Sequence, residues 1–141
     1  MEDQVLSDAD LDEAKNLDQR FAAAWRSNDL EAVMACFWND PGLHVVVNGE
    51  VHRGYQAVRA MFKQMLDQHE SITLTVDDLS YVRSGEGVIG VGTATFDLKP
   101  PGGPGTLLVE RWSDLRRKVD GRWVYVLDHA TILPQEAEGT E

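Results

Sequence analysis

The side chains best suited to chemistry lie near the carboxyl end of the chain, on two apolar runs that flank Asp120-Gly121. This pair favours a two-residue hairpin turn, because both of its positions tolerate positive φ. With that turn, Ser113 lies opposite Asp128, and side chains alternate between the two faces of the hairpin. One face would then present these residues: Arg111, Ser113, Leu115, Val124, Val126, Asp128 and Ala130.

This face combines a carboxylate and a guanidinium with mostly apolar neighbours. Burial of both charges is costly unless they are paired, so Asp128 and Arg111 allow three interpretations. In the first, Asp128 is a general acid or base, and Arg111 steadies it or an enolate-like oxygen. In the second, the two residues anchor a ligand. In the third, they form a buried ion pair that only fixes the hairpin.

His129 is a second candidate, on the opposite face of the hairpin, because imidazole gains or loses a proton near neutral pH. A slip of one residue in the pairing would exchange His129 with Asp128. The simpler interpretation packs His129 at a contact between subunits, near Trp112. A β-bulge in the hairpin would reverse the assignment of the two faces.

The elements that position these residues follow from the hydrophobic periodicity. Apolar residues recur at three- and four-residue steps after Ser7, after a predicted capping box at Asn28 and Glu31, and after Gly54, which predicts three helices. Turn signals and alternation predict strands at these segments: 43–47, 50–53, 72–77, 88–98, 106–118 and 122–132. The order predicts an α+β fold in which helices cover one side of a bent, mainly antiparallel sheet.

A curved sheet capped by helices leaves an apolar pocket at its open end. The residues predicted to line that pocket, together with Ser113 and Val126, are Phe21, Trp25, Val45, Val47, Met61, Phe62 and Leu66. The spacing of these residues is also what any amphipathic core requires, so a role in the core alone remains open for each.

Composition narrows the class of protein. The 141 residues predict a single domain with acidic, solvated ends, and the net charge of −11 argues against nucleic acid and anionic membranes as partners. No apolar run reaches the ~18 residues of a membrane span, and the amino terminus lacks a signal-peptide pattern, so a cytoplasmic protein is expected. Cys36 is the single cysteine, and His44, His52 and His69 share no metal-ligand spacing, so neither a metal nor a cofactor is expected.

Three segments carry a family resemblance: F-A-A-A-W-x-x-N-D-L-E-A-V-x-x-x-F at 21–37, R-G-x-x-A-V at 53–58 and D-G-R-W-x-x-x-x-D-H-x-T at 120–131. Over roughly residues 8–133 the chain resembles the nuclear-transport-factor-2-like superfamily, which includes ketosteroid isomerase and SnoaL-like polyketide cyclases. The resemblance implies a cone-shaped α+β barrel on three helices, usually a homodimer. It also implies that the Asp128 face of the hairpin lines the pocket and that the other face is free for a dimer contact. Trp25 would be the lining residue best placed to contact a ligand.

The isomerase chemistry can be compared residue by residue. The isomerase requires a tyrosine on the first helix, a base aspartate on the first strand and a protonated aspartate on a late strand. In this chain the first position falls on Phe21 and the second on Val45, neither of which transfers a proton. The third lies between Glu110 and Leu115. The standard isomerase mechanism is therefore not expected.

Two functions remain. The first is a cofactor-free enzyme of SnoaL-like type, an isomerase or lyase that moves a proton on a small, mostly apolar carbonyl compound by isomerisation, dehydration or cyclisation. The alternative is a non-catalytic module for ligand binding or association, because Leu115-Arg116-Arg117-Lys118 and Trp123 resemble the association domain of calmodulin-dependent kinase. Aromatic residues expected on the outer face, Trp112, Trp123 and Tyr125, would serve such an association.

Overall fold

A computed structural model describes residues 6–134, and the predicted solvated ends lie almost wholly outside this range. The elements follow the predicted order: α1 (Asp8–Arg26), α2 (Leu30–Met34), β1 (His44–Val47), β2 (Glu50–Arg53), α3 (Tyr55–Gln68), β3 (Ser71–Ser84), β4 (Gly87–Lys99), β5 (Thr106–Val119) and β6 (Arg122–Ile132). Within residues 6–134, no helix combines the length and the apolar character that a membrane crossing requires.

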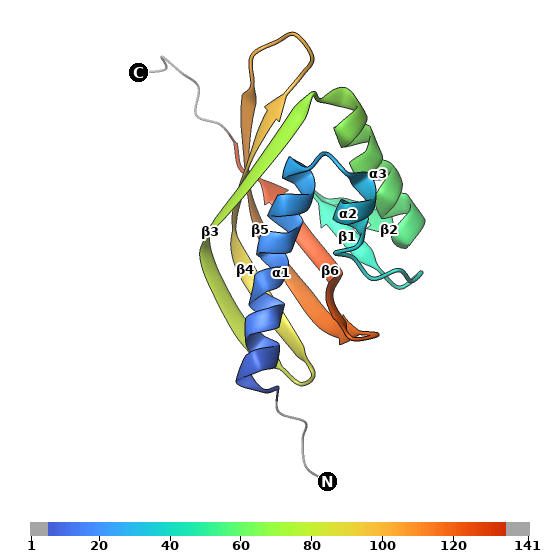
Figure 1. Ribbon diagram of the computed structural model, residues 1–141, viewed down its shortest axis with the longest axis vertical. Helices are drawn as coiled ribbons and strands as arrows, with labels where there is room; N and C mark the ends of the chain where they lie inside the picture. The colour runs from blue at the N-terminus through green and yellow to red at the C-terminus, as the bar shows by residue number, and fades with distance from the viewer. Residues whose placement is uncertain (1–5, 135–141) are drawn as a thin grey trace.

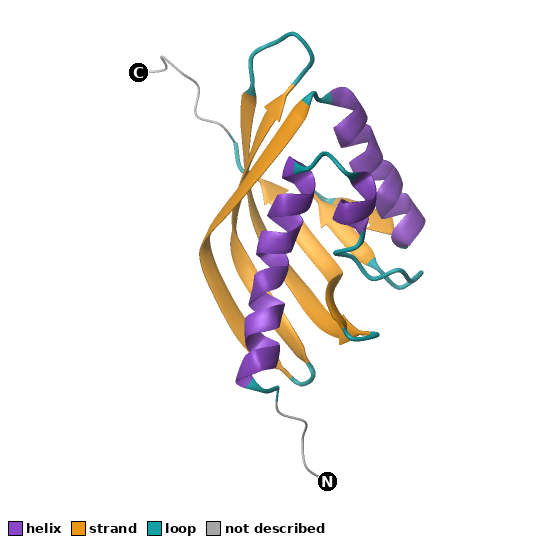
Figure 2. Cartoon of the chain, in the orientation of Figure 1, coloured by secondary structure: helices purple, strands orange, loops and turns teal. Residues whose placement is uncertain are grey.

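The strands form one six-stranded sheet in the order β2-β1-β6-β5-β4-β3. All neighbours are antiparallel except β1 and β6, which run parallel. The sheet bends strongly, and all three helices lie on one of its sides, with α1 across the long strands and α3 beside the short β1-β2 pair (Figure 1). Figure 2 shows the same separation into a helical layer and a strand layer, which is the predicted α+β cone.

Local chemistry explains the ends of the elements. The Ser7 side chain accepts a hydrogen bond from the Asp10 backbone N–H at 3.0 Å and so caps α1. The predicted cap of α2 was wrong by one residue, because Asp29, not Asn28, accepts hydrogen bonds from the first turn. Asn28 instead adopts a φ of 59°, a left-handed conformation that asparagine tolerates.

The predicted Asp120-Gly121 turn is confirmed, and the β1-β2 hairpin has a turn of the same kind at Asn48-Gly49. Asn48 and Gly49 have φ values of 52° and 88°, and Asp120 and Gly121 have 51° and 81°. A positive φ at both central residues defines the type I′ turn, whose twist suits antiparallel strands.

The core lies between the helices and the concave side of the sheet. Its centre is a set of aromatic rings in mutual edge or tilted contact, with centroids 5.1–6.3 Å apart. These rings belong to Phe21, Trp25, Phe37, Phe62, Phe96 and Tyr125. Aromatic residues from both the helices and the sheet therefore fill much of the interior between them and leave little free space there.

Candidate functional site

The geometry of the site depends on a β-bulge in the last hairpin. From the turn, β5 and β6 pair regularly as far as Arg116 opposite Tyr125, and pairing resumes with Leu115 opposite Leu127. Val126 is the extra residue, and beyond it the register moves by one. The predicted pairing of Ser113 with Asp128 was therefore wrong, because Asp128 lies opposite Asp114.

The bulge changes which side chains of β5 face the core. The inner face of this strand carries the even-numbered residues from Glu110 to Arg116, the reverse of the prediction. On β6, Asp128 faces inward, as predicted. Val126 is buried, but it is not part of the cavity lining.

A small cavity of about 30 Å³ lies against this inner face, roughly the space of one water molecule. Its walls come from α1 and the strands β3 to β6: Phe21, Leu74, Val76, Ala94, Phe96, Glu110, Trp112, Asp114, Tyr125 and Asp128. Three carboxyl groups thus face one mostly aromatic and aliphatic space.

An ionic cluster forms the floor beneath this cavity. The Arg116 side chain is fully buried, and its Nε and Nη2 donate to Asp114 at 2.9 and 2.8 Å. Its Nη1 and Nη2 also donate to Asp18 of α1 at 3.2 and 3.1 Å. Tyr81 and Tyr125 donate their hydroxyl hydrogens to the two oxygens of Asp18. One cation therefore holds two carboxylates, and both are buried.

Two glycines on β4 make room for this arrangement. A Cβ at Gly90 would lie 2.6 Å from Arg116 Nη2, and one at Gly92 would lie 2.6 Å from the Trp112 ring. Both glycines allow close packing, since the side chains of β5 lie directly against the β4 backbone. Gly92 also lies opposite a β-bulge in β3, between Asp77 and Ser80.

The carboxyl groups of the cavity hold their protons to higher pH than usual. Burial raises the pKa of Glu110 to about 7. Burial also raises the pKa of Asp114 to about 6, although the Arg116 hydrogen bonds and charge oppose the shift. The pKa of Asp128 lies well above its usual range, first because of burial and then because of the charges of Asp114 and Glu110.

Asp128 differs from Asp114 in its surroundings. Between residues 6 and 134, no side chain or backbone group makes a hydrogen bond or ion pair with the Asp128 carboxyl. Val45 of β1 lies beside it in the parallel register. The position that the resemblance aligns with the isomerase base is therefore next to a carboxyl supplied by the neighbouring strand.

The model of the SnoaL-like domain family matches residues 19–126, which is most of the chain. The chain belongs to this SnoaL-like family. A curated relative, the queuosine 5'-phosphate N-glycosylase/hydrolase of Sphaerobacter thermophilus, is 36% identical over 67 residues, 43% of this chain. This match spans about a fifth of the length of that relative (21%).

Solved structures resemble the SnoaL-like chain over nearly its full length. A candidate dehydratase of the NTF2-like family from Streptomyces avermitilis has a TM-score of 0.81 at 18% identity, covering 92% of this chain and 100% of that one. A candidate calcium/calmodulin-dependent protein kinase II association domain from Xanthomonas campestris has a TM-score of 0.76 at 18% identity, covering 96% and 97%. At such identities these structures show a shared fold and nothing more.

The predicted lining of the SnoaL-like pocket is distributed between the cavity and the core. Phe21 lines the cavity. Trp25 is fully buried behind it, and its indole N–H has no partner among residues 6–134. The other predicted lining residues on β1 and α3 lie in or against the hydrophobic core rather than at the cavity: Val45, Val47, Met61, Phe62 and Leu66.

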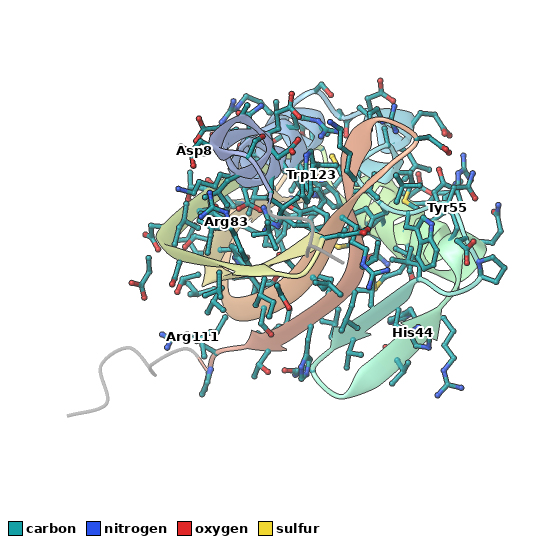
Figure 3. The ribbon with its side chains drawn as sticks, turned by 90° about the horizontal axis from the view of Figure 1, so that it is seen from below. Asp8, His44, Tyr55, Arg83, Arg111 and Trp123 are labelled. Carbon is teal, nitrogen blue, oxygen red and sulfur yellow. The ribbon has the colours of Figure 1, made fainter. Side chains whose placement is uncertain are left out.

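Three predicted polar residues lie on the outer face of the sheet. Arg111, Ser113 and His129 surround a shallow depression there, together with Val91 and Thr131. Figure 3 shows Arg111 and His44 projecting from the side of the sheet opposite the helices. The predicted pairing of Asp128 with Arg111 was therefore wrong, because the strand places the two side chains on opposite faces.

The interpretation of the sequence missed Glu110, Asp114 and Arg116 as site residues. They recur at every second position with Trp112, and this alternation identifies one face of a strand. This alternation is visible in the sequence. The prediction placed that face on the outside because it continued the pairing from the turn without a bulge. Within residues 6–134, no three His, Cys, Asp or Glu side chains are grouped so that they could hold a metal ion.

Proposed function

We propose that this SnoaL-like chain is a cofactor-free enzyme that moves a proton on a small, mostly apolar carbonyl compound. The observation that carries the proposal is the Asp128 carboxyl, which faces an apolar cavity with no partner among the described residues. Isomerisation, dehydration and cyclisation all require such a group. The acidic composition and the single cysteine favour a cytoplasmic location.

The cavity supplies both an acid and a base. Burial and the charges of its carboxylate neighbours raise the pKa of Asp128 well above its usual range, so Asp128 keeps its proton to higher pH and can donate a proton or a hydrogen bond to a substrate oxygen. Glu110, whose pKa is about 7, can accept a proton in the same space. We leave Arg111 and His129 out of this reaction because their side chains lie on the outer face.

The size of the cavity sets a condition on binding. About 30 Å³ holds one water-sized group, so a larger substrate must displace part of the lining. Phe21 is half-buried, whereas the other rings of the lining are buried, so Phe21 is the lining ring closest to solvent, and moving it would disrupt its contacts with four other rings. The cavity is large enough for a carbonyl oxygen beside Asp128.

The direct test is a carboxyl NMR titration of Asp128, assigned with the Asp128→Asn variant. We expect a pKa well above the ordinary aspartate value of about 3.9, because the carboxyl is buried among other carboxylates. A measured value below that reference would show a locked, ionised aspartate. The proposed proton transfer would then be wrong.

A second candidate function is association of two copies through the outer face of the sheet. Val82, Ile89, Leu115 and Leu127 lie side by side in register across β3 to β6 on that face. Ile89 and Leu127 are 38% and 43% exposed. The aromatic residues expected there are instead buried, so the apolar surface is aliphatic. A second copy is the occupant we propose, because a continuous aliphatic row can pack on itself about a two-fold axis.

Light scattering tests this association. The Leu127→Glu variant should reduce a particle of twice the 15.7 kDa chain mass to a monomer, because a charge replaces an exposed apolar side chain of the proposed contact. Thr106→Glu, exposed at the start of β5, is the matched control and should leave the mass unchanged. A monomeric wild-type protein would exclude the proposal.

A further inference from the structure

The proposed acid has a second carboxyl group directly across the hairpin. Asp114 and Asp128 are cross-strand partners on the inner face, and both line the cavity. Side chains at directly opposed positions are about 5 Å apart at Cβ, and like charges there repel. The two carboxyl groups therefore do not both ionise readily.

The structure determines which of the two carries the charge. Asp114 receives two hydrogen bonds from the Arg116 guanidinium and a third from the Gly90 backbone N–H. Each of these donors favours the ionised carboxylate. Asp128 has no donor among the described residues, so its neutral form is the one that the site favours.

We propose that Asp114 is a positioning residue, which Arg116 holds as a carboxylate so that its charge keeps the proton on the Asp128 carboxyl. This inference rests on the proposed function, since it concerns the acid of that reaction. Asp114 itself is 6% exposed and bound to Arg116, so we place its action in its charge, which acts on Asp128. Arg116 also forms an ion pair with Asp18, which connects Asp114 and Arg116 to helix α1.

The charged and titratable groups around Asp128 support this assignment. On β5 they are Glu110, Asp114 and Arg116, and on β6 the nearest is Tyr125. From α1, Asp18 binds Arg116, and its charge also raises the pKa of Asp128, by less than those of Asp114 and Glu110.

The remaining elements add no charge to the cavity. The cavity residues of β3 and β4 are apolar, and Tyr81 of β3 donates to Asp18. On the far side, Val45 of β1 separates Asp128 from His52 of β2, which pairs with Glu50. Among these groups the Asp114 charge raises the pKa of Asp128 most, and Glu110 follows.

The test compares two variants that each remove one carboxylate from Arg116. Asp114→Asn should lower the pKa of Asp128 in an NMR titration by more than Asp18→Asn does, because only Asp114 faces Asp128. Asp18→Asn removes hydrogen bonds from Arg116, Tyr81 and Tyr125, so it perturbs the cluster at least as much. Equal shifts in both variants, or none in Asp114→Asn, would reduce Asp114 to a structural role.

A second measurement needs no variant, in case either one fails to fold. In the wild-type titration, Asp114 should lose its proton first, near the pKa of about 6 that burial and Arg116 give it, and Asp128 should lose its proton at higher pH. The reverse order would overturn the inference and leave the proposed function intact. A low pKa of Asp128 in the wild type would instead overturn the proposed function itself.

Discussion

Replacing Arg116 with methionine is expected to lower the free energy of unfolding by about 3–5 kcal/mol, the usual cost of leaving buried charges without their partner. Arg116 has no exposed surface, and it binds Asp18, Asp114 and the Ala14 carbonyl. Its loss leaves two carboxyl groups in the interior with no cation. The free energy of unfolding of a small domain is about 5–15 kcal/mol, so this loss is a large share of the total stability.

Urea denaturation of Arg116→Met and Arg117→Met tests this expectation. Arg117 is the next residue of β5 and is exposed on the other face, so its variant should stay within about 0.5 kcal/mol of the wild type. The methionine substitution is the same in both, which isolates the effect of burial. Equal stability of the two variants would show that the ionic cluster of Arg116, Asp18 and Asp114 does not stabilise the packing of α1 on the sheet.

The burial of Arg116 was not predicted from the sequence. The run Leu115-Arg116-Arg117-Lys118 has the appearance of a basic strand, yet its residues divide between an interior face and a solvent face. The residue types of this run do not show which of Arg116 and Arg117 is buried. Their separation depends on two acidic partners, Asp18 at a distance of 98 residues and Asp114 two residues away.

The fold was predictable because its signals are local. The Ser7 cap, the apolar stripes and the Asp120-Gly121 turn each depend on a few neighbouring residues, and the helices and strands follow the predicted order. The site was less predictable because it depends on register. One extra residue, Val126, moves Asp114 opposite Asp128 and sends Arg111 to the outer face. Such a bulge has no distinctive residue type in this hairpin, so an alternating pattern does not reveal it.

Asp128→Asn is expected to lower the rate of proton transfer by about 10²–10⁴-fold, the usual contribution of a positioned acid or base. An amide keeps the shape of the carboxyl group but does not exchange a proton with the substrate. The measurement is the loss of α-proton NMR signals in deuterated water, over a panel of small apolar ketones and enones. Ser113→Ala, an outer-face change on the neighbouring strand, is the matched control and should keep the wild-type rate.

The same substitution should make stability less dependent on pH, and this separates a catalytic role from a structural one. An unfolded aspartate loses its proton near pH 3.9, whereas burial and the charges of Asp114 and Glu110 raise the pKa of folded Asp128 well above that value. Over this interval the folded state binds the extra proton, so wild-type stability falls as the pH rises. The Asp128→Asn variant lacks this contribution, so its temperature of half-unfolding should fall less steeply as the pH rises above the unfolded pKa of about 3.9. An equally steep fall in both proteins would show that Asp128 is not the buried neutral carboxyl on which the proposed reaction depends.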